Sequence, residues 1–173
     1  MSPRAAWRLE SFGFREVYDY VAGKLDWLAA GLATEGELAN QPRAGTVARH
    51  DVPTCLMDEL LGDVQARVRE SDWDACVVVN GEGVVFGLLR SRELDRGEPD
   101  KRIEEAMRPG PSTFRPHVPI DEMASYMIRH DLESAPITTS DGRLVGLLRR
   151  QDAARVAMEL HEREHEEHQG EGG

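Results

Sequence analysis

The chain has 173 residues, 40% of them hydrophobic, and a net charge of −11 at pH 7. This size allows one hydrophobic core or two small ones. The acidic balance argues against general nucleic-acid binding, and no apolar run approaches the roughly 20 residues of a membrane-spanning helix. Because the charged stretch 1–10 also lacks the apolar segment of a secretion signal, we expect a cytoplasmic protein that binds neither membranes nor nucleic acid.

The first 45 residues differ in composition from the rest. Residues 1–36 are expected to form a helix with Trp7 and Leu9, a break at Gly13, a short segment Val17–Tyr20 and a helix over Lys24–Ala30 that Gly31 ends. Residues 37–45, with the sequence ELANQPRAG, combine Pro, Gly and Asn. This composition predicts a linker.

From Thr46 onward the chain repeats itself. Sliding the sequence by 59 positions, without a gap, places Thr54 on Thr113 and Gly83 on Gly142. The same shift places the tetrapeptide Gly-Leu-Leu-Arg at 87–90 on an identical tetrapeptide at 146–149. A repeat of this length predicts two units of similar structure.

Each copy is expected to follow the order strand, helix, strand, strand, helix. In the first copy, a strand near Thr54 precedes a helix that carries Leu61, Val64 and Val68 on one face. The strands Ala75–Val79 and Val84–Leu89 then form a hairpin, and a last helix begins at Ser91.

The second copy shows the same order. A strand near Thr113 precedes a helix that Pro119 can begin, with one apolar stripe at Ile120, Met123, Ala124, Met127 and Ile128. The hairpin strands are Ala135–Thr138 and Leu144–Leu148, and the last helix begins at Arg150. Because one unit of about 55 residues buries little surface, we expect the two units to pack through their sheets.

The second copy also carries a family resemblance. It rests on the tracts Ile103–Pro109, Ser134–Ile137 and Asp141–Leu148, followed by Asp152. With the repeated unit, these tracts resemble the CBS domain, and two such units in tandem resemble a Bateman module, over about residues 46–160. The resemblance implies an α/β (α+β) fold and a regulatory rather than an enzymatic role. Many such modules bind AMP, ADP, ATP or S-adenosylmethionine in the cleft between the units.

The ligand motif of that family is Gly, two apolar residues, Ser or Thr, two variable residues and Asp. The carboxylate binds both ribose hydroxyls, while the hydroxyl and the helix N-terminus face the phosphate. The second copy keeps Gly146 and Asp152 but has Arg149 at the hydroxyl position. The first copy has Arg90 there and Glu93 in place of the Asp.

The resemblance implies a set of ligand residues with distinct roles. They are Asp152 for the ribose, Arg149 and Arg150 for the phosphate, Thr113 and Pro136 for the base, and Glu93 and Arg90 as weaker counterparts in the first copy. A guanidinium can grip a phosphate through two hydrogen bonds, but it can also fill the pocket and pair with the nearby carboxylate. A ligand-free packing or dimerisation role, as an adaptor for a partner protein, is therefore the alternative.

Residues 1–36 resemble the C-terminal end of a rhodanese-like domain, through tracts such as Gly13–Val17 and Tyr18–Lys24. The catalytic cysteine of that family would precede Ser2, and Cys55 has acidic surroundings and no anion-binding loop. We therefore expect no sulfurtransferase activity. The aromatic residues of this region are expected to pack on the repeated region or on a second subunit: Trp7, Phe12, Phe14, Tyr18 and Trp27.

Other motifs have competing interpretations. His161 and His165 match the HExxH zinc signature, with His168 one turn later, but the surrounding helix is charged and unsuited to a protease core. The two interpretations of this segment are therefore adventitious binding of zinc or nickel and a solvated helix end. Trp73 is expected in the core, with a stacking role at a ligand cleft as the alternative. Further expectations are that both cysteines (Cys55, Cys76) and five methionines (Met57, Met107, Met123, Met127, Met158) are packing residues, and that Arg143, Arg149, Arg150 and Arg155 form a basic cluster.

These expectations divide the chain into five parts. They are a rhodanese-tail-like extension (1–36), a linker (37–45), a first unit (46–106), a second unit (107–160) and an acidic tail with histidines (161–173). Modules of this type commonly pair, so we expect a homodimer.

Overall fold

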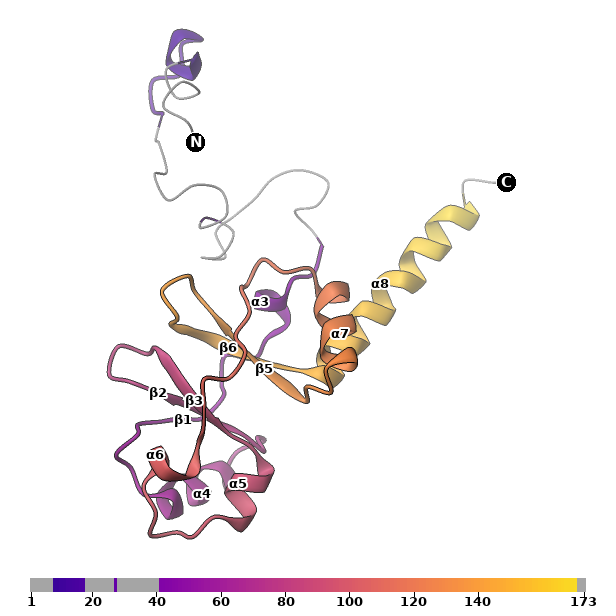
Figure 1. Cartoon of the computed structure of the whole chain (residues 1–173). Coiled ribbons are helices and arrows are strands. Elements are labelled where there is room, and N and C mark those ends of the chain that lie inside the picture. Colours follow the sequence, from indigo (N-terminus) through magenta and orange to yellow (C-terminus); the bar gives the residue numbers. More distant parts are fainter. Residues whose placement is uncertain (1–7, 18–26, 28–40, 171–173) are drawn as a thin grey trace.

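The computed structural model describes residues 8–17, 27 and 41–170, with side chains as far as residue 163. Helices and antiparallel hairpin strands are mixed along the chain from residue 44 onward, which gives an α+β fold (Figure 1). Their bounds are α3 (Ala44–Val47), β1 (Thr54–Cys55), α4 (Leu61–Arg69), β2 (Cys76–Val79), β3 (Val85–Leu89), α5 (Ser91–Arg96), α6 (Ile103–Ala106), β4 (Arg108–Pro109), α7 (Ile120–Arg129), β5 (Ser134–Thr138), β6 (Leu144–Arg149) and α8 (Arg150–Gly170).

The two copies share their strand pairing. In the first sheet β1 runs parallel to β2, β2 antiparallel to β3, and β4 completes the edge. In the second sheet β5 is antiparallel to β6, and Phe114 makes a parallel bridge with Ile137. Phe114 and Ile137 are the repeat equivalents of Cys55 and Val78, which pair β1 with β2. The strand order of one copy is therefore repeated in the other, as the sequence predicts.

The helices cover the sheets because their apolar residues recur on one face. In α7, Ile120, Met123, Ala124 and Met127 are buried as predicted, but Ile128 is 61% exposed. At 3.6 residues per turn, a position eight residues on lies about 80° around the helix from the first, at the edge of the stripe. Pro119 is the residue that caps α7 rather than its first helical residue.

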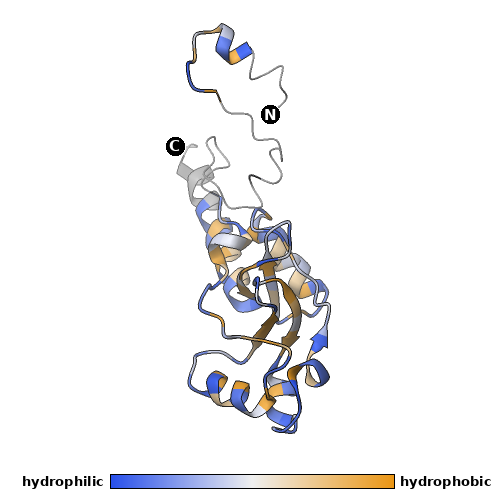
Figure 2. Cartoon of the chain, turned by 90° about the vertical axis from the view of Figure 1, so that its left-hand side faces the viewer, coloured by the Kyte–Doolittle hydropathy of each residue, from blue (hydrophilic) through white to orange (hydrophobic). Residues whose placement is uncertain are grey.

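Three clusters of buried side chains form the core of the described part of the chain. One packs the first sheet against α4 and α5, and another packs the second sheet against α3, α7 and α8. The third lies between the sheets and contains both Leu88 and Leu147, which are equivalent in the repeat. Figure 2 shows the strands as the most hydrophobic part of the chain, with helices that are hydrophilic outside. The two hairpins therefore meet face to face through equivalent residues.

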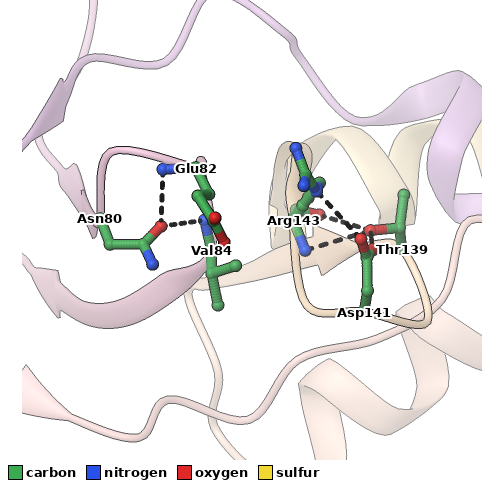
Figure 3. Close-up of polar contacts among 6 residues, drawn as sticks. All are labelled: Asn80, Glu82, Val84, Thr139, Asp141 and Arg143. Carbon is green, nitrogen blue, oxygen red and sulfur yellow. Dashed lines mark hydrogen bonds and ion pairs between the residues drawn. The ribbon is translucent and has the colours of Figure 1, made fainter.

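The turns of the two hairpins contact each other in a reciprocal manner. Val85 N donates to Gly142 O at 3.0 Å, and Leu144 N donates to Gly83 O at 2.9 Å. Because the donors are repeat equivalents and so are the acceptors, the contact has approximate twofold symmetry. Side-chain hydrogen bonds brace each turn, from Asn80 in one and among Thr139, Asp141 and Arg143 in the other (Figure 3).

The segment that leads into each copy packs on the other copy. Helix α3 belongs to the core of the second copy, and Arg49 makes a bridge with Leu147 of β6. Helix α6 and β4, at the equivalent positions 59 residues later, pack on the first copy. Ala44, near the end of the predicted linker, is helical and fully buried in the core of the second copy, and its amide donates to Val118 O.

Residues 8–11 form a helical turn that ends near Gly13, which has a φ of 92° as the expected break requires. Phe12 and Phe14 are 67% and 61% exposed, so their predicted packing on the repeated region is wrong, and contact with a second subunit stays a prediction. The expectations for residues 18–26 and 28–36, and for Trp7, lie outside the described residues. No described helix is long and apolar enough to cross a membrane.

Candidate functional site

A cavity of about 620 Å³ lies between the two copies. Each copy contributes the same two kinds of segment to its wall. Residues 72–75 and 133–134 lie at the starts of β2 and β5, and residues 90–91 and 149–151 lie at the ends of β3 and β6. Leu147 of the inter-sheet core also lines it. Since the hairpin turns lie at the other ends of these strands, the cavity and the turns occupy opposite ends of the sheets.

Arg149, the last residue of β6, reaches across to the first copy. Its guanidinium carbon lies 4.1 Å from the centroid of the Trp73 ring, and its Nη2 donates to the Asp72 carbonyl. Trp73 is only 5% exposed, which confirms its expected place in the core, yet it also lines the cavity. Arg149 is therefore held against the wall by cation–π stacking and one hydrogen bond.

Arg49 is a member of this cluster that sequence analysis did not identify. Its guanidinium carbon lies 4.7 Å from the Trp73 ring centroid, and its Nε donates to Asp51 Oδ1 at 3.0 Å. The hydrogen bond to Asp51 raises the pKa of Arg49, and the charges of Asp72 and Asp152 raise it further. The only signal in the sequence is that Arg49 is the repeat equivalent of Arg108, and both arginines lie in segments that cross to the other copy.

Asp152, the proposed ribose ligand, lies in the first turn of α8. Its side chain is 26% exposed, and within the described residues its one ion pair is a long contact with Arg155 Nη2 at 3.9 Å. Asp152 does not line the cavity, but its charge acts on Arg49, which stacks on the Trp73 of the cavity wall. The carboxylate retains most of its capacity to accept hydrogen bonds.

Glu93, the counterpart in the first copy, is already engaged. Its Oε2 accepts from the Arg90 amide at 3.1 Å and its Oε1 from Arg108 Nε at 2.8 Å. Burial alone would raise the pKa of Glu93, but these two hydrogen bonds outweigh it and hold the pKa below its ordinary value. Glu93 caps α5 and links it to β4. Because both of its carboxylate oxygens already accept hydrogen bonds, Glu93 is less suited to the weaker ligand role expected of it.

We expect Glu93→Gln to lower the free energy of unfolding by about 1 kcal/mol at pH 7, because it removes a charge that accepts two hydrogen bonds. The folded-state pKa is depressed, so this stabilisation is complete above the unfolded value of about 4.3 and is lost as the pH falls through the folded value. Thermal unfolding of both proteins between pH 7 and pH 3 should therefore show melting temperatures that converge in acid.

Glu98→Gln provides the matched control for this experiment. Glu98 pairs with Lys101 at 3.3 Å, but its side chain is 74% exposed, so its loss should change the melting temperature little. A difference between wild type and Glu93→Gln that stays constant with pH would contradict the assignment.

The cavity brings together three of the seven predicted site residues: Arg90, Arg149 and Arg150. Thr113 is exposed, and Pro136 is buried in β5 opposite Leu147; neither lies on the cavity wall. The expected basic cluster is wrong, because Arg143 lies at the hairpin turn and pairs with Asp141, at the far end of β6 from Arg149. Although Arg143 and Arg149 are close in the sequence, the extended strand β6 separates them by its full length.

Other predicted features lie outside the cavity. Met158 is 64% exposed, so its expected packing role is wrong, whereas Cys55 and Cys76 are buried and free. His161 Nδ1 hydrogen-bonds to the Ala157 carbonyl within α8. The side chains of His165 and His168 lie outside the described part of the chain, and within that part no three metal-binding side chains converge.

Comparisons with known proteins agree with this architecture. The family model of the CBS domain matches residues 103–159. The uncharacterized protein MK0525 of Methanopyrus kandleri is 27% identical over 119 residues, which cover 65% of this chain and 61% of that protein. Inosine-5'-monophosphate dehydrogenase of Mycobacterium tuberculosis is 29% identical over 119 residues, which cover 67% of this chain but 22% of the enzyme. The chain thus spans less than two thirds of the length of these relatives.

Solved structures show the same fold. The cytosolic domain of the Mg²⁺ channel MgtE in complex with ATP has a TM-score of 0.62 at 25% identity, over 69% of this chain and 51% of that one. CBSX2 in complex with AMP has a TM-score of 0.61 at 17% identity, over 68% of this chain and 97% of CBSX2. The CBS domain pair of protein MJ0100 in complex with 5'-methylthioadenosine and S-adenosylmethionine has a TM-score of 0.60 at 18% identity, over 67% of this chain and 95% of that one. The chain therefore contains a CBS domain at residues 103–159 and has the α+β fold of CBS-domain proteins.

Proposed function

We propose that residues 46–160 are a tandem pair of CBS units, a Bateman module that binds an adenosine-containing ligand and regulates a partner without catalysis. The observation that carries this proposal is the cavity between the copies, whose wall is built from equivalent segments of both. A ligand in such a cavity contacts two covalently linked units at once, so its binding can change how the units sit together. Structures of similar fold hold ATP, AMP, 5'-methylthioadenosine or S-adenosylmethionine.

The second copy is the better candidate for the ligand site. Asp152 makes only a long ion pair, whereas Glu93 is engaged by Arg108 and by the Arg90 amide. Trp73, which the first copy contributes, stacks on Arg149 of the second copy, whereas the repeat equivalent of Trp73 is Leu132. We assign Arg149 and Arg150, which line the cavity, to the phosphate. We assign Asp152 to the ribose and Thr113 and Pro136 to the base, and because these three residues do not line the cavity, the ribose and base would extend beyond it.

Thermal unfolding with AMP, ADP, ATP and S-adenosylmethionine tests the proposal. A ligand present at 100 times its dissociation constant should stabilise the protein by about 2.7 kcal/mol. Asp152→Ala should abolish the shift, while Asp95→Ala, an exposed carboxylate on α5, should leave it unchanged. If no adenosine compound raises the melting temperature, the regulatory proposal fails.

A ligand-free adaptor is the second candidate, favoured by the internal engagement of Arg149 with Trp73 and Asp72. In that case Ile128 and Met158, both more than 60% exposed on the adjacent helices α7 and α8, belong to a contact with a second copy or with a partner protein. Light scattering distinguishes this case, because Ile128→Ser should then shift the protein from dimer to monomer without any ligand.

We also propose that residues 1–36 derive from a rhodanese-like domain and that the protein works in the cytoplasm.

A further inference from the structure

Two equivalent arginines, one from each copy, line the same cavity. Arg90 follows β3 directly and Arg149 ends β6, and the two positions coincide in the repeat. The sequence motif assigns them to two separate ligand sites. The structure instead brings both guanidiniums, together with Arg150, to one space of about 620 Å³.

Both arginines hold buried donors that have no acceptor. The Nε atoms of Arg90 and Arg149 are inaccessible to solvent, and no described residue accepts a hydrogen bond from either. Apart from Trp73 stacking, the only described acceptor for the Arg149 guanidinium is the Asp72 carbonyl, and the Arg90 guanidinium has no ion-pair partner in the described chain. Buried N–H groups are normally satisfied, and a cation with unused donors is a strong site for an oxyanion.

The carboxylates near the cavity do not neutralise these cations. Asp72, Asp74 and Glu133 line it too, but all three residues are exposed, and none forms an ion pair with the arginines in the described structure. Arg150 pairs with Asp131 at 2.8 Å, whose side chain is 94% exposed. Water screens exposed carboxylates, while the partly buried guanidiniums keep more of their attraction for a ligand in the cavity.

We infer that Arg90 and Arg149 form a single anion subsite, shared by the two copies, for a condensed phosphate chain. Each guanidinium presents a fork that matches one phosphoryl group, so two forks from opposite copies suit a ligand with at least two. The chain of phosphates is either free or part of a nucleoside di- or triphosphate. For the nucleotide this inference rests on the function proposed above, whereas for the free anion it does not.

Isothermal titration of the full chain with tripolyphosphate, orthophosphate, ATP and AMP tests the subsite. We expect ATP to bind at least 10-fold more tightly than AMP, and tripolyphosphate at least 10-fold more tightly than orthophosphate. Arg90→Met should remove both preferences, so that ATP binds no more tightly than AMP and tripolyphosphate no more tightly than orthophosphate. Because the Arg90 guanidinium has no described partner to lose, the variant should fold, and circular dichroism verifies this. Arg96→Met, an exposed arginine on α5, is the control.

The outcomes separate this inference from the proposed function. Equal affinity for ATP and AMP, with no effect of Arg90→Met, overturns the shared subsite and leaves the adenosine site standing. Binding of tripolyphosphate that requires Arg90, without binding of any adenosine compound, supports the subsite and contradicts the nucleotide proposal. If none of the four ligands binds, the shared subsite fails, and the proposed function fails as well if ADP and S-adenosylmethionine also give no thermal shift.

Discussion

Replacing Leu147 with alanine is expected to lower the free energy of unfolding by about 3 kcal/mol, within the range for truncation of a fully buried leucine. Leu147 is fully buried between the two sheets, where it joins Leu88 and Trp73, and it also lines the cavity. Strand β5 on one side and the bridge to Arg49 on the other hold the backbone of β6 in place, so the surrounding side chains have little freedom to close the gap. Urea unfolding followed by circular dichroism measures this loss.

Leu56→Ala is the matched control for Leu147→Ala. Leu56 is 42% exposed in the segment after β1, so its truncation should change the free energy of unfolding by less than about 0.5 kcal/mol. If the two variants lose the same stability, the inter-sheet cluster is not a stabilising core. The two copies would then have to be held together only by the hairpin turns and by the leading segments that pack on the opposite copy (α3 with Arg49, and α6 with β4).

Much of the fold could be predicted because its signals are local and occur twice. The strands expected at Val84–Leu89 and Leu144–Leu148 are found at Val85–Leu89 and Leu144–Arg149. Each hairpin has a glycine of positive φ in its turn, Gly83 or Gly142, and nearly continuous apolar strands beside it. A shift of 59 positions makes each copy a test of the other. Agreement between two copies therefore compensates for the weakness of any single short strand signal.

The exchange of leading segments could not be predicted, because it depends on contacts between distant parts of the chain. Ala44 pairs with Val118, and Arg49 with Leu147, with no periodic pattern to announce either contact. For the same reason the sequence motif could identify Glu93 as a possible ligand but not its partner Arg108, which β4 brings alongside. Arg49 was missed because its role at the cavity follows from the crossing alone.

The candidate site differs between the copies although their backbones match. The positions that distinguish them are side chains: Trp73 against Leu132, and Asp152 against Glu93. The carboxylate difference favours the second copy, because Asp152 makes one long ion pair within the described residues whereas Glu93 is engaged. The aromatic ring of Trp73 comes from the first copy and stacks on Arg149 of the second. Repetition thus explains the architecture, while departures from the repeat decide where a ligand can bind.

Gly146→Ala is expected to cost about 3 kcal/mol of folding stability, at the upper end of the range for overpacking. A Cβ at this position would lie 2.6 Å from the Arg49 carbonyl oxygen, which is backbone and cannot rotate away. That oxygen accepts from the Leu147 amide at 2.9 Å, and Leu147 O accepts from the Arg49 amide at 3.1 Å. Relief of the clash therefore requires these two hydrogen bonds to lengthen or break, and it moves Arg49 away from Trp73.

The same substitution at two other glycines should cost less stability, and these variants serve as controls. A Cβ at Gly87, the repeat equivalent, would meet the flexible side chain of Met107, and a Cβ at Gly81 would meet nothing within 4 Å. The loss of stability in urea should therefore decrease from Gly146→Ala through Gly87→Ala to Gly81→Ala, which should be nearly neutral. Tryptophan fluorescence should change with Gly146→Ala alone, since only that substitution displaces a cation from the Trp73 ring. An equal loss for Gly146→Ala and Gly81→Ala would contradict the close crossing of the leading segment over β6.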